Sequence, residues 1–448
     1  MSDNNRELMK KDLAYILQLN KKINYDNITE VKKARNMVLQ KNLFKTPLGQ
    51  KYIRRLEQIS SGITSDKCVL CGNDLDNSSL ICTQCLSKYK DAPDKKGSAV
   101  SSENKSAELT EISKQAVTTL KGGLDTFTSK INELAGESGA VDLRLRDLFS
   151  GIFQKHTREE SEEIFIAGTL KTTPAESDIA VSWPKPWLFS RVLMILLASY
   201  GLLHICVAEF QNPLAMPGLM FLGALAIPFS ILIFIFETNA PRNISIFETI
   251  KMFFYGGTAS LVLTLFLYTI FPVEQLDYSG AIIVGFVEEL GKLLAIIIFV
   301  RRLNPKYILN GMLIGASIGA GFAVFETAGY AYRAFQSSFF DFSYMTDTLF
   351  VRGWSSLGSH VVWSAIVGAG LVMVKGNKPF EYNLIWNVKF QKFFFISVIL
   401  HAIWDAPLMS EAYVIKLIIL IAVAWIIILV MLNAGLKQIE RICSAYRN

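Results

Sequence analysis

The chain has 448 residues, of which 51% are hydrophobic and 19% are charged, and its formal net charge is +6. The hydrophobic share is high for a soluble globular chain and low for a pure membrane bundle, so the composition favours a mixed architecture. The positive charge is spread along the chain, and we expect no nucleic-acid partner. Residues 1–30 are polar and lysine-rich, so we expect no signal peptide.

The N-terminal region combines basic helices with a cysteine cluster. Residues 5–60 place apolar side chains on one face of helices, and 1–65 is expected to be a basic helical region. Two CxxC pairs follow within 66–88; they are formed by Cys68, Cys71, Cys82 and Cys85. Two such knuckles can surround one ion with four thiolates, which predicts a zinc ribbon that binds Zn²⁺. Ribbons of this kind are structural or bind a regulatory protein.

A polar stretch leads from the ribbon towards the membrane. Residues 89–106 are rich in Ser, Asp and Lys and predict a flexible linker. Within 107–186 we expect amphipathic helices over 107–140 and 141–176, the first suited to a surface position or to oligomer formation. His156, beside Lys155, is interpreted as a solvated surface residue.

The C-terminal half consists of apolar stretches long enough to span a bilayer. About 20 helical residues cross a hydrocarbon core. The eight expected spans are 187–210, 213–236, 250–271, 279–300, 308–332, 355–375, 390–409 and 412–433. The fold class is therefore an all-α polytopic membrane bundle over 187–433, with a tail over 434–448.

Lys and Arg in the short loops set the orientation. With a cytoplasmic N-terminus, the inside loops carry about twelve basic residues, and the outside loop 333–354 has only Arg333 and Arg352. Eight spans with both termini in the cytoplasm satisfy this asymmetry, and the expected location is a bacterial-type inner membrane.

Ionisable side chains inside the membrane cluster in four expected spans. They are Glu288, Glu289, Lys292, Glu326, His360, His401 and Asp405. At 1.5 Å per residue, the acidic and imidazole groups all lie roughly 6–14 Å below the outer boundary. A charge at mid-bilayer costs roughly 3 kcal/mol on insertion scales, so convergence at one depth indicates a catalytic or metal site.

The spacing of these residues suits hydrolytic chemistry. His401 and Asp405 share a helix face, and Lys292 lies one turn from the adjacent Glu288 and Glu289. Two adjacent buried carboxylates cannot both ionise cheaply, and one of them is suited to general acid/base work. His360 and His401, with Glu326 or Asp405, form a ligand set for a second Zn²⁺ ion.

Other functions remain open at this level. Single polar residues in spans are often helix–helix hydrogen bonds. Glu, His and Asp also relay protons in transporters, which are typically built from inverted repeats, and spans 1–4 and 5–8 show no convincing repeat. A third alternative is a sensor or scaffold in which the ribbon is active and the membrane part has lost activity.

Three ordered motifs resemble those of the PrsW-type intramembrane proteases, distant relatives of the CAAX prenyl endopeptidases. Glu288 to Lys292 resembles the EExxK motif, Phe322 to Glu326 the FxxxE motif, and His401 to Asp405 the HxxxD motif. His360 corresponds to a further histidine often found between the second and third motifs, and the resemblance covers 187–433.

The resemblance implies an endopeptidase of metallo- or glutamic type that cuts a membrane-anchored protein, for example an anti-sigma-like regulator, near the outer face. On this interpretation Glu288 or Glu289 activates a water molecule, Lys292 orients the pair and Phe322 shapes the substrate pocket. His360 and His401, with Glu326 or Asp405, bind zinc or the developing oxyanion.

Overall fold

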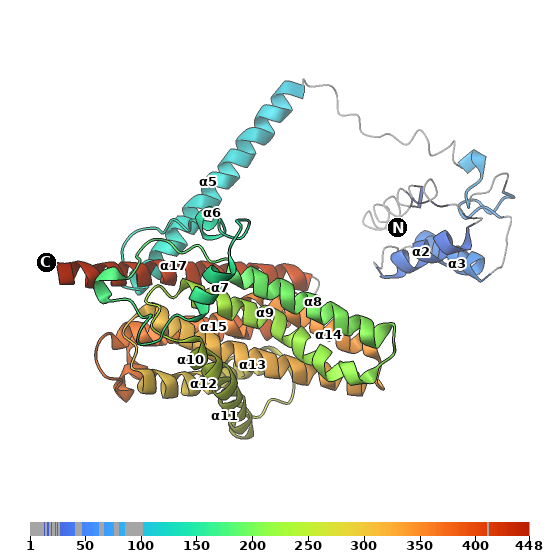
Figure 1. Ribbon diagram of the computed structural model, residues 1–448. Coiled ribbons are helices and arrows are strands. Elements are labelled where there is room, and N and C mark those ends of the chain that lie inside the picture. The colour runs from blue at the N-terminus through green and yellow to red at the C-terminus, as the bar shows by residue number, and fades with distance from the viewer. Residues whose placement is uncertain are drawn as a thin grey trace. The chain divides into compact units, whose positions relative to one another are not determined.

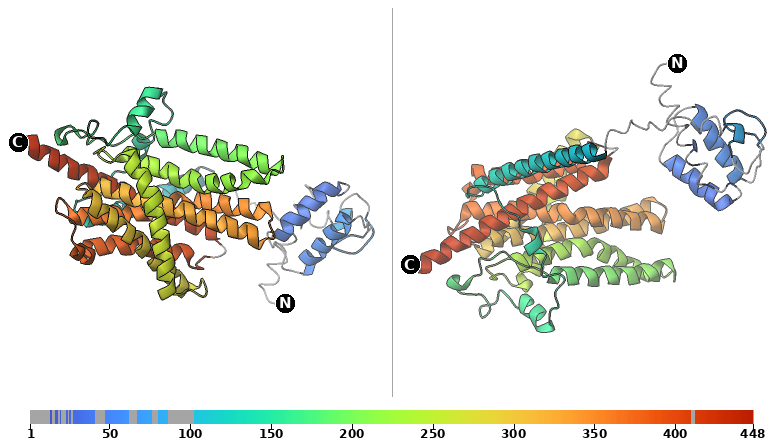
Figure 2. Two further views of the ribbon diagram at one scale, coloured as in Figure 1. Left: turned by 60° about the horizontal axis from the view of Figure 1, so that its bottom comes forward. Right: turned by 90° about the horizontal axis from the view of Figure 1, so that it is seen from above.

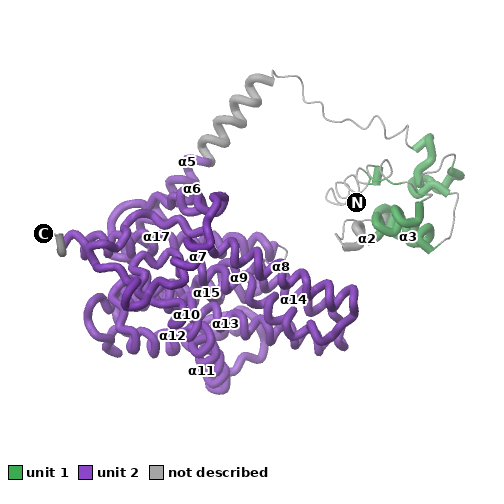
Figure 3. Tube along the Cα trace, viewed as in Figure 1, with its two compact units in different colours: residues 1–114 green, residues 115–448 purple. Residues whose placement is uncertain are grey.

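The computed structural model describes residues 102–409 and 412–447; in the N-terminal part it describes 27–40, 47–61, 67–75, 80–85 and single positions between 13 and 25. The chain divides into two compact units, residues 1–114 and 115–448 (Figure 3). Most of the expected linker over 89–106 lies outside the described residues. Its end already belongs to helix α5 (Ser102–Leu134).

The N-terminal unit contains two of the amphipathic helices expected within 5–60. They are α2 (Ile28–Gln40) and α3 (Pro47–Ser60). The helices pack against each other around Val31, Tyr52 and Leu56, which are fully buried. The cysteine-bearing turns contribute to the same hydrophobic core. Cores this small usually need a metal or disulfides to be stable.

The predicted helix over 141–176 is wrong for most of its length. Only α6 (Leu145–Leu148), α7 (Arg158–Phe165) and the single turn η1 (Glu176–Asp178) are helical. A reciprocal capping box between Thr157 and Glu160 starts α7. Gly168, with φ of 82°, prevents its continuation because the left-handed conformation ends a helix. The apolar periodicity of the sequence therefore did not predict where the short helix α7 begins and ends.

His156 is not a solvated surface residue, which corrects the sequence interpretation. Its ring stacks on the Trp187 ring with 3.7 Å between centroids. Nδ1 contacts Glu160 Oε2 and Nε2 contacts the Gly151 carbonyl oxygen, each at 2.9 Å. The side chain is only 14% exposed, because Trp187, at the start of the first membrane helix, covers one face of the ring.

Six helical stretches of the described residues are long and apolar enough to cross a membrane. They are α8 (Leu188–Ala208), η2–α9 (Pro213–Thr238), α10–η3–α11 (Ile246–Ile270), α13 (Ile308–Ser337), α14–η4–α15 (Phe342–Lys375) and α17 (Tyr413–Arg447). The expected eight spans also included 279–300 and 390–409. These are helices α12 (Tyr278–Leu303) and α16 (Val388–Asp405), and each carries several charged residues. Helix α12 carries the motif residues Glu288, Glu289 and Lys292, and α16 carries His401 and Asp405.

The expected outside loop over 333–354 is largely helical, which is a further correction. Helix α14 (Phe342–Ser355) is followed by the turn η4 (Ser356–Gly358) and by α15 (His360–Lys375). α14 packs against α9 (Met216–Thr238) and α13. Met345 and Leu349 on its inner face are buried, so the helix forms because it covers an apolar surface.

Helix α13 is the centre of the bundle, and its residues 308–324 are all buried. It crosses α15 closely, because a Cβ at Gly315 would lie 1.9 Å from the Ser364 carbonyl oxygen and one at Gly311 would lie 2.3 Å from that of Gly368. Small residues permit such close approach of membrane helices. Figures 1 and 2 show α8, α9, α13, α15 and α17 running along one direction, while the α10–α11 segment crosses them steeply.

Candidate active site

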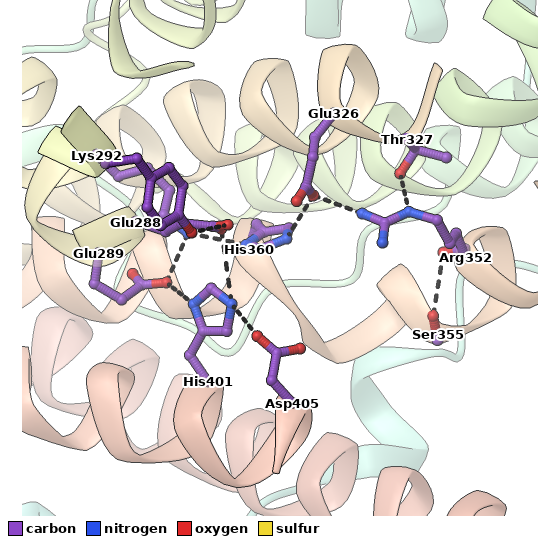
Figure 4. A network of polar contacts seen from close by, with 11 residues as sticks. Glu288, Glu289, Lys292, Glu326, Thr327, Arg352, Ser355, His360, His401 and Asp405 are labelled. Atoms are coloured by element: carbon purple, nitrogen blue, oxygen red, sulfur yellow. Dashed lines mark hydrogen bonds and ion pairs between the residues drawn. The ribbon is translucent and has the colours of Figure 1, made fainter. Parts of the chain in front are cut away.

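Four helices bring the predicted site residues together in one polar network (Figure 4). Helix α12 supplies Glu288, Glu289 and Lys292, α13 supplies Glu326, α15 supplies His360, and α16 supplies His401 and Asp405. Helix α12 packs between α11 (Gly257–Ile270) and α16, and α15 packs against both α13 and α16. The six acidic and imidazole side chains that the sequence placed at one depth, together with Lys292, therefore also converge laterally.

Glu289 and Lys292 contact each other and both imidazoles, although Glu289 Oε2 is buried and has no hydrogen-bond partner among the described residues. Lys292 Nζ donates to Glu289 Oε1 at 2.6 Å and to His360 Nδ1 at 2.9 Å. His401 Nδ1 contacts the same Glu289 oxygen at 2.9 Å. Because a carboxylate accepts, His401 donates from Nδ1, and in the neutral imidazole Nε2 then carries no proton. These hydrogen bonds fix the orientation of both imidazole rings: Glu289 fixes that of His401, and Lys292 fixes that of His360.

Glu288 and Glu289 each have one buried oxygen without a partner, but only Glu288 of the two lines the cavity described below. Tyr268 Oη donates to Oε1 at 3.1 Å. Oε2 is buried and has no hydrogen-bond partner among the described residues, and it lies 3.7 Å from His401 Nε2. A buried polar atom without a partner is unfavourable unless water, a metal ion or a substrate completes it.

His360 lies between Lys292 and Glu326. Lysine can only donate, so His360 Nδ1 accepts from it and the proton resides on Nε2, which donates to Glu326 Oε2 at 3.0 Å. Arg352 Nη2 donates to the same Glu326 oxygen at 2.5 Å, and Arg352 Nε donates to Thr327 Oγ1 at 3.2 Å. Glu326 therefore links the imidazole of α15 to the guanidinium of α14.

Asp405 and Phe322 occupy the edge and the back of the network. Asp405 Oδ2 lies 3.4 Å from His401 Nε2, and its side chain is 23% exposed. Phe322, expected to shape a substrate pocket, packs with its ring 5.1 Å from that of His360 and 4.6 Å from Lys292 Nζ. Phe322 lies behind the cavity and supports the residues that face it.

A cavity of about 120 Å³ opens beside these groups. Its lining includes Glu288, Glu326, His360, His401 and Asp405, together with Tyr268, Arg352, Ser355, Ser356 and Ser359. This volume holds a few water molecules or a short stretch of extended peptide backbone. Polar groups that converge on a small cavity are typical of an active site.

Three of these residues can hold a metal ion. One ligand atom each from Glu288, His360 and His401 lies within 4.8 Å of the others. The expected ligand set had Glu326 or Asp405 as its carboxylate; the carboxylate in this group is Glu288, because its free oxygen faces His401. Two histidines and a glutamate are a typical catalytic zinc set.

The charges of the network agree with a divalent cation. The carboxylates are those of Glu288, Glu289, Glu326 and Asp405, and the cations are Lys292 and Arg352. With neutral imidazoles two negative charges remain without a counter-ion. Since buried charges are normally paired, a metal ion with two positive charges fits this donor set.

The family comparison decides what kind of domain surrounds this site. Residues 246–432 match the family model described as PrsW family intramembrane metalloprotease. The chain carries a PrsW-family intramembrane metalloprotease domain. It is therefore a multi-pass membrane enzyme, and the family implies a protein substrate. No curated protein and no solved structure matches the chain.

The PrsW-family domain contains all three motifs and His360, but it is shorter than the resemblance over 187–433 suggested. The match begins at α10 (Ile246–Lys251), so α8 and α9 lie outside it. The cysteine cluster also lies outside the match, as expected for an addition to the family core.

Sequence reasoning missed Tyr268, Arg352 and Trp363 as neighbours of the PrsW motifs. The Trp363 ring packs 4.6 Å from the His401 ring. The position of Arg352 could have been predicted from the sequence. It lies seven residues after Met345, and this helical spacing places it on the buried face of α14. Tyr268 lies on another helix from its partner Glu288, and nothing in the sequence connects them.

The cysteine cluster of the N-terminal unit is a second group that can hold a metal. Sulfur atoms of all four cysteines lie within 4.8 Å of one another, in agreement with the predicted ribbon. Burial opposes ionisation of the Cys68 thiol, but backbone N–H groups of Cys82 and Cys71 donate to it and lower its pKa to about 6. Burial and the neighbouring thiols raise the pKa of Cys85. Four thiolates at this distance require a cation, and Cys₄ is a typical structural zinc set.

Proposed function

We propose that this chain is an intramembrane endopeptidase that hydrolyses a peptide bond of a membrane-anchored protein, such as an anti-sigma-like regulator, near the outer face of the membrane. The observation that carries the proposal is Glu288, whose buried Oε2 is uncommitted and faces His401 Nε2 across a small cavity. The PrsW-family domain supplies the reaction class.

The proposed topology has eight spans, the six apolar ones together with α12 and α16. Helix α16 has 18 residues, a length of about 27 Å at 1.5 Å per residue, and α12 is longer. Glu288, Glu289, Lys292 and His401 are all buried inside the bundle and do not face lipid. The excess of basic residues in alternate loops supports cytoplasmic termini and a bacterial-type inner membrane.

In the proposed chemistry Glu288 is the general base. Its free oxygen can accept a proton from a water molecule in the cavity and later return it to the leaving amine. Glu289 acts through His401, because its hydrogen bond fixes the ring with Nε2 towards the cavity. Lys292 and Glu326 engage both ring nitrogens of His360 and so fix its orientation, and Asp405 borders the exposed side.

The alternative to Glu288 as the base is a Zn²⁺ ion that Glu288, His360 and His401 would hold, which requires that His360 give up its hydrogen bond to Lys292 or to Glu326. When bound it would polarise a carbonyl oxygen and acidify water. If Glu288 is a ligand, Glu326 or Asp405 becomes the candidate base, because both line the same cavity. The ribbon cysteines are proposed to hold a separate structural Zn²⁺ and to present a surface for a regulatory protein.

The decisive experiment compares the new N-termini in membranes that contain the wild type with those that contain Glu288→Gln, at equal protein levels. We expect termini near the outer edge of one or more single-span proteins, present with the wild type and absent with the variant. Glu274→Gln is the matched control, because Glu274 is exposed between α11 and α12 and lies outside the cavity. Identical profiles in all three membranes under several envelope stresses would favour a transporter or a scaffold.

A further inference from the structure

Arg352 lines the cavity but belongs to none of the PrsW motifs quoted above. It lies in the last turn of α14, the helix that the sequence had placed in an outside loop. Its side chain is 28% exposed, so the guanidinium is neither buried in the bundle nor free in solvent. A charged side chain at such a position requires a reason beyond packing.

Three contacts fix the guanidinium rigidly. Nη2 donates to Glu326 Oε2 at 2.5 Å, and Nε donates to Thr327 Oγ1 at 3.2 Å. The guanidinium carbon lies 4.2 Å from the centroid of the Tyr330 ring. Because the guanidinium is a rigid planar fork, these three contacts also fix the direction of its remaining N–H groups.

The remaining nitrogen, Nη1, has no acceptor among residues 102–409 and 412–447. The dashed lines in Figure 4 reach the other two nitrogens of Arg352 and leave this one bare. Arg352 lines the same cavity as Glu288 and His401, and a single carboxylate, that of Glu326, separates it from His360. Nη1 is therefore a preorganised donor beside the proposed reaction centre.

We propose that Arg352 binds a main-chain carbonyl oxygen of the substrate through Nη1, next to the bond that is cut. The proposal rests on the proposed protease function. A carbonyl oxygen fits better than an acidic side chain because Glu326 already neutralises the guanidinium. A further carboxylate would also be repelled by Glu288, Glu326 and Asp405 around the same cavity.

The test uses the full chain in liposomes and a synthetic single-span peptide with the sequence identified from the new N-termini. Arg352→Gln is expected to raise KM and to lower kcat/KM by about 10- to 100-fold, the usual effect of losing a hydrogen bond to a charged donor. Arg352→Lys keeps the positive charge but lacks the planar guanidinium, so its kcat/KM should lie between those of the wild type and Arg352→Gln. Arg333→Gln is the matched control, because Arg333 is exposed at the end of α13.

A purely structural role for Arg352 makes a different prediction. It would lower the active fraction and hence the apparent kcat, with KM unchanged, and this result would overturn the proposal. Full activity of Arg352→Gln would overturn it too, while leaving the protease function intact. If the wild type cleaves no peptide, the proposed function fails and the inference fails with it.

Replacing single peptide bonds of the substrate by esters locates the carbonyl. An ester carbonyl is a weaker acceptor, so one ester near the cut should slow the wild type and leave Arg352→Gln unaffected. If each ester slowed the wild type and Arg352→Gln equally, Arg352 would not contact the main chain of the substrate. If replacing an acidic substrate side chain shows the coupling instead, Arg352 recognises that side chain and the proposal is wrong.

Discussion

The two groups that can hold a metal are built in opposite ways. The cysteine cluster lies entirely between Cys68 and Cys85, on two short turns that each supply two sulfurs. The group in the PrsW-family domain joins Glu288, His360 and His401 from three helices that are far apart in sequence. The cysteine cluster depends on local sequence spacing, and the group of Glu288, His360 and His401 depends on helix packing. Different substitutions should therefore disrupt the two groups.

The largest expected effect is on the cysteine cluster. Cys82→Ser removes one of four ligands, and since metal binding in such ribbons contributes about 10 kcal/mol to folding, the core shared with α2 and α3 should open. Hydrogen exchange of residues 27–85, together with the zinc content, measures this. Cys206→Ser on α8 is the control and should change neither. An unchanged zinc content in Cys82→Ser would show that the cluster is not a metal site.

The next effect concerns the glutamate pair. Glu288→Gln should reduce the cleavage rate by about 1,000-fold, or about 4 kcal/mol in the barrier, because it removes the proposed base. Glu289→Gln should cost about 10- to 100-fold, since Glu289 acts only through His401. Initial rates with the synthetic substrate measure both, and zinc in the ribbon should stay unchanged. A larger loss in Glu289→Gln than in Glu288→Gln would reverse the assigned roles.

Packing of the PrsW-family domain can be tested on a single helix. Gly315→Ala should destabilise the domain by about 2–3 kcal/mol, because its methyl group would lie 1.9 Å from the Ser364 carbonyl oxygen. Gly329→Ala, on the same helix but with nothing within 4 Å, should instead stabilise by about 0.5–1 kcal/mol. Thermal unfolding in nanodiscs reports both. Equal effects of the two substitutions would contradict the close crossing of α13 and α15.

The smallest expected effect concerns the N-terminal cap of helix α7, which lies outside both groups that can hold a metal. Thr157→Ala removes the side-chain cap of α7 and should destabilise that helix by about 1 kcal/mol. Hydrogen exchange of the α7 amides should accelerate, while cleavage and zinc content stay unchanged. Ser161→Ala, inside the same helix, is the control. Slower cleavage in Thr157→Ala would mean that the segment around α7 is coupled to the active site.

Much of the architecture was readable from the sequence. Apolar stretches located the membrane helices, because length and hydropathy are local properties. The CxxC spacing located the cysteine cluster for the same reason. Motif spacing located the residues of α12, α13 and α16 that meet in the polar network, whereas the helix α14 was missed because its apolar face is short and interrupted by polar residues.

The sequence could not distinguish Glu288 from Glu289, and only the tertiary structure separated them. Adjacent residues on a helix point about 100° apart, so the rotation of α12 decides which one faces the cavity. Two close contacts fix that rotation: Gly291 abuts Thr264 of α11, and Gly285 abuts the backbone of α16 at Ala402. Likewise, the sequence contained Arg352 and Glu326, but only the packing of α14 on α13 brought them together. Local patterns fix which residues are available, whereas long-range packing fixes which atoms face each other.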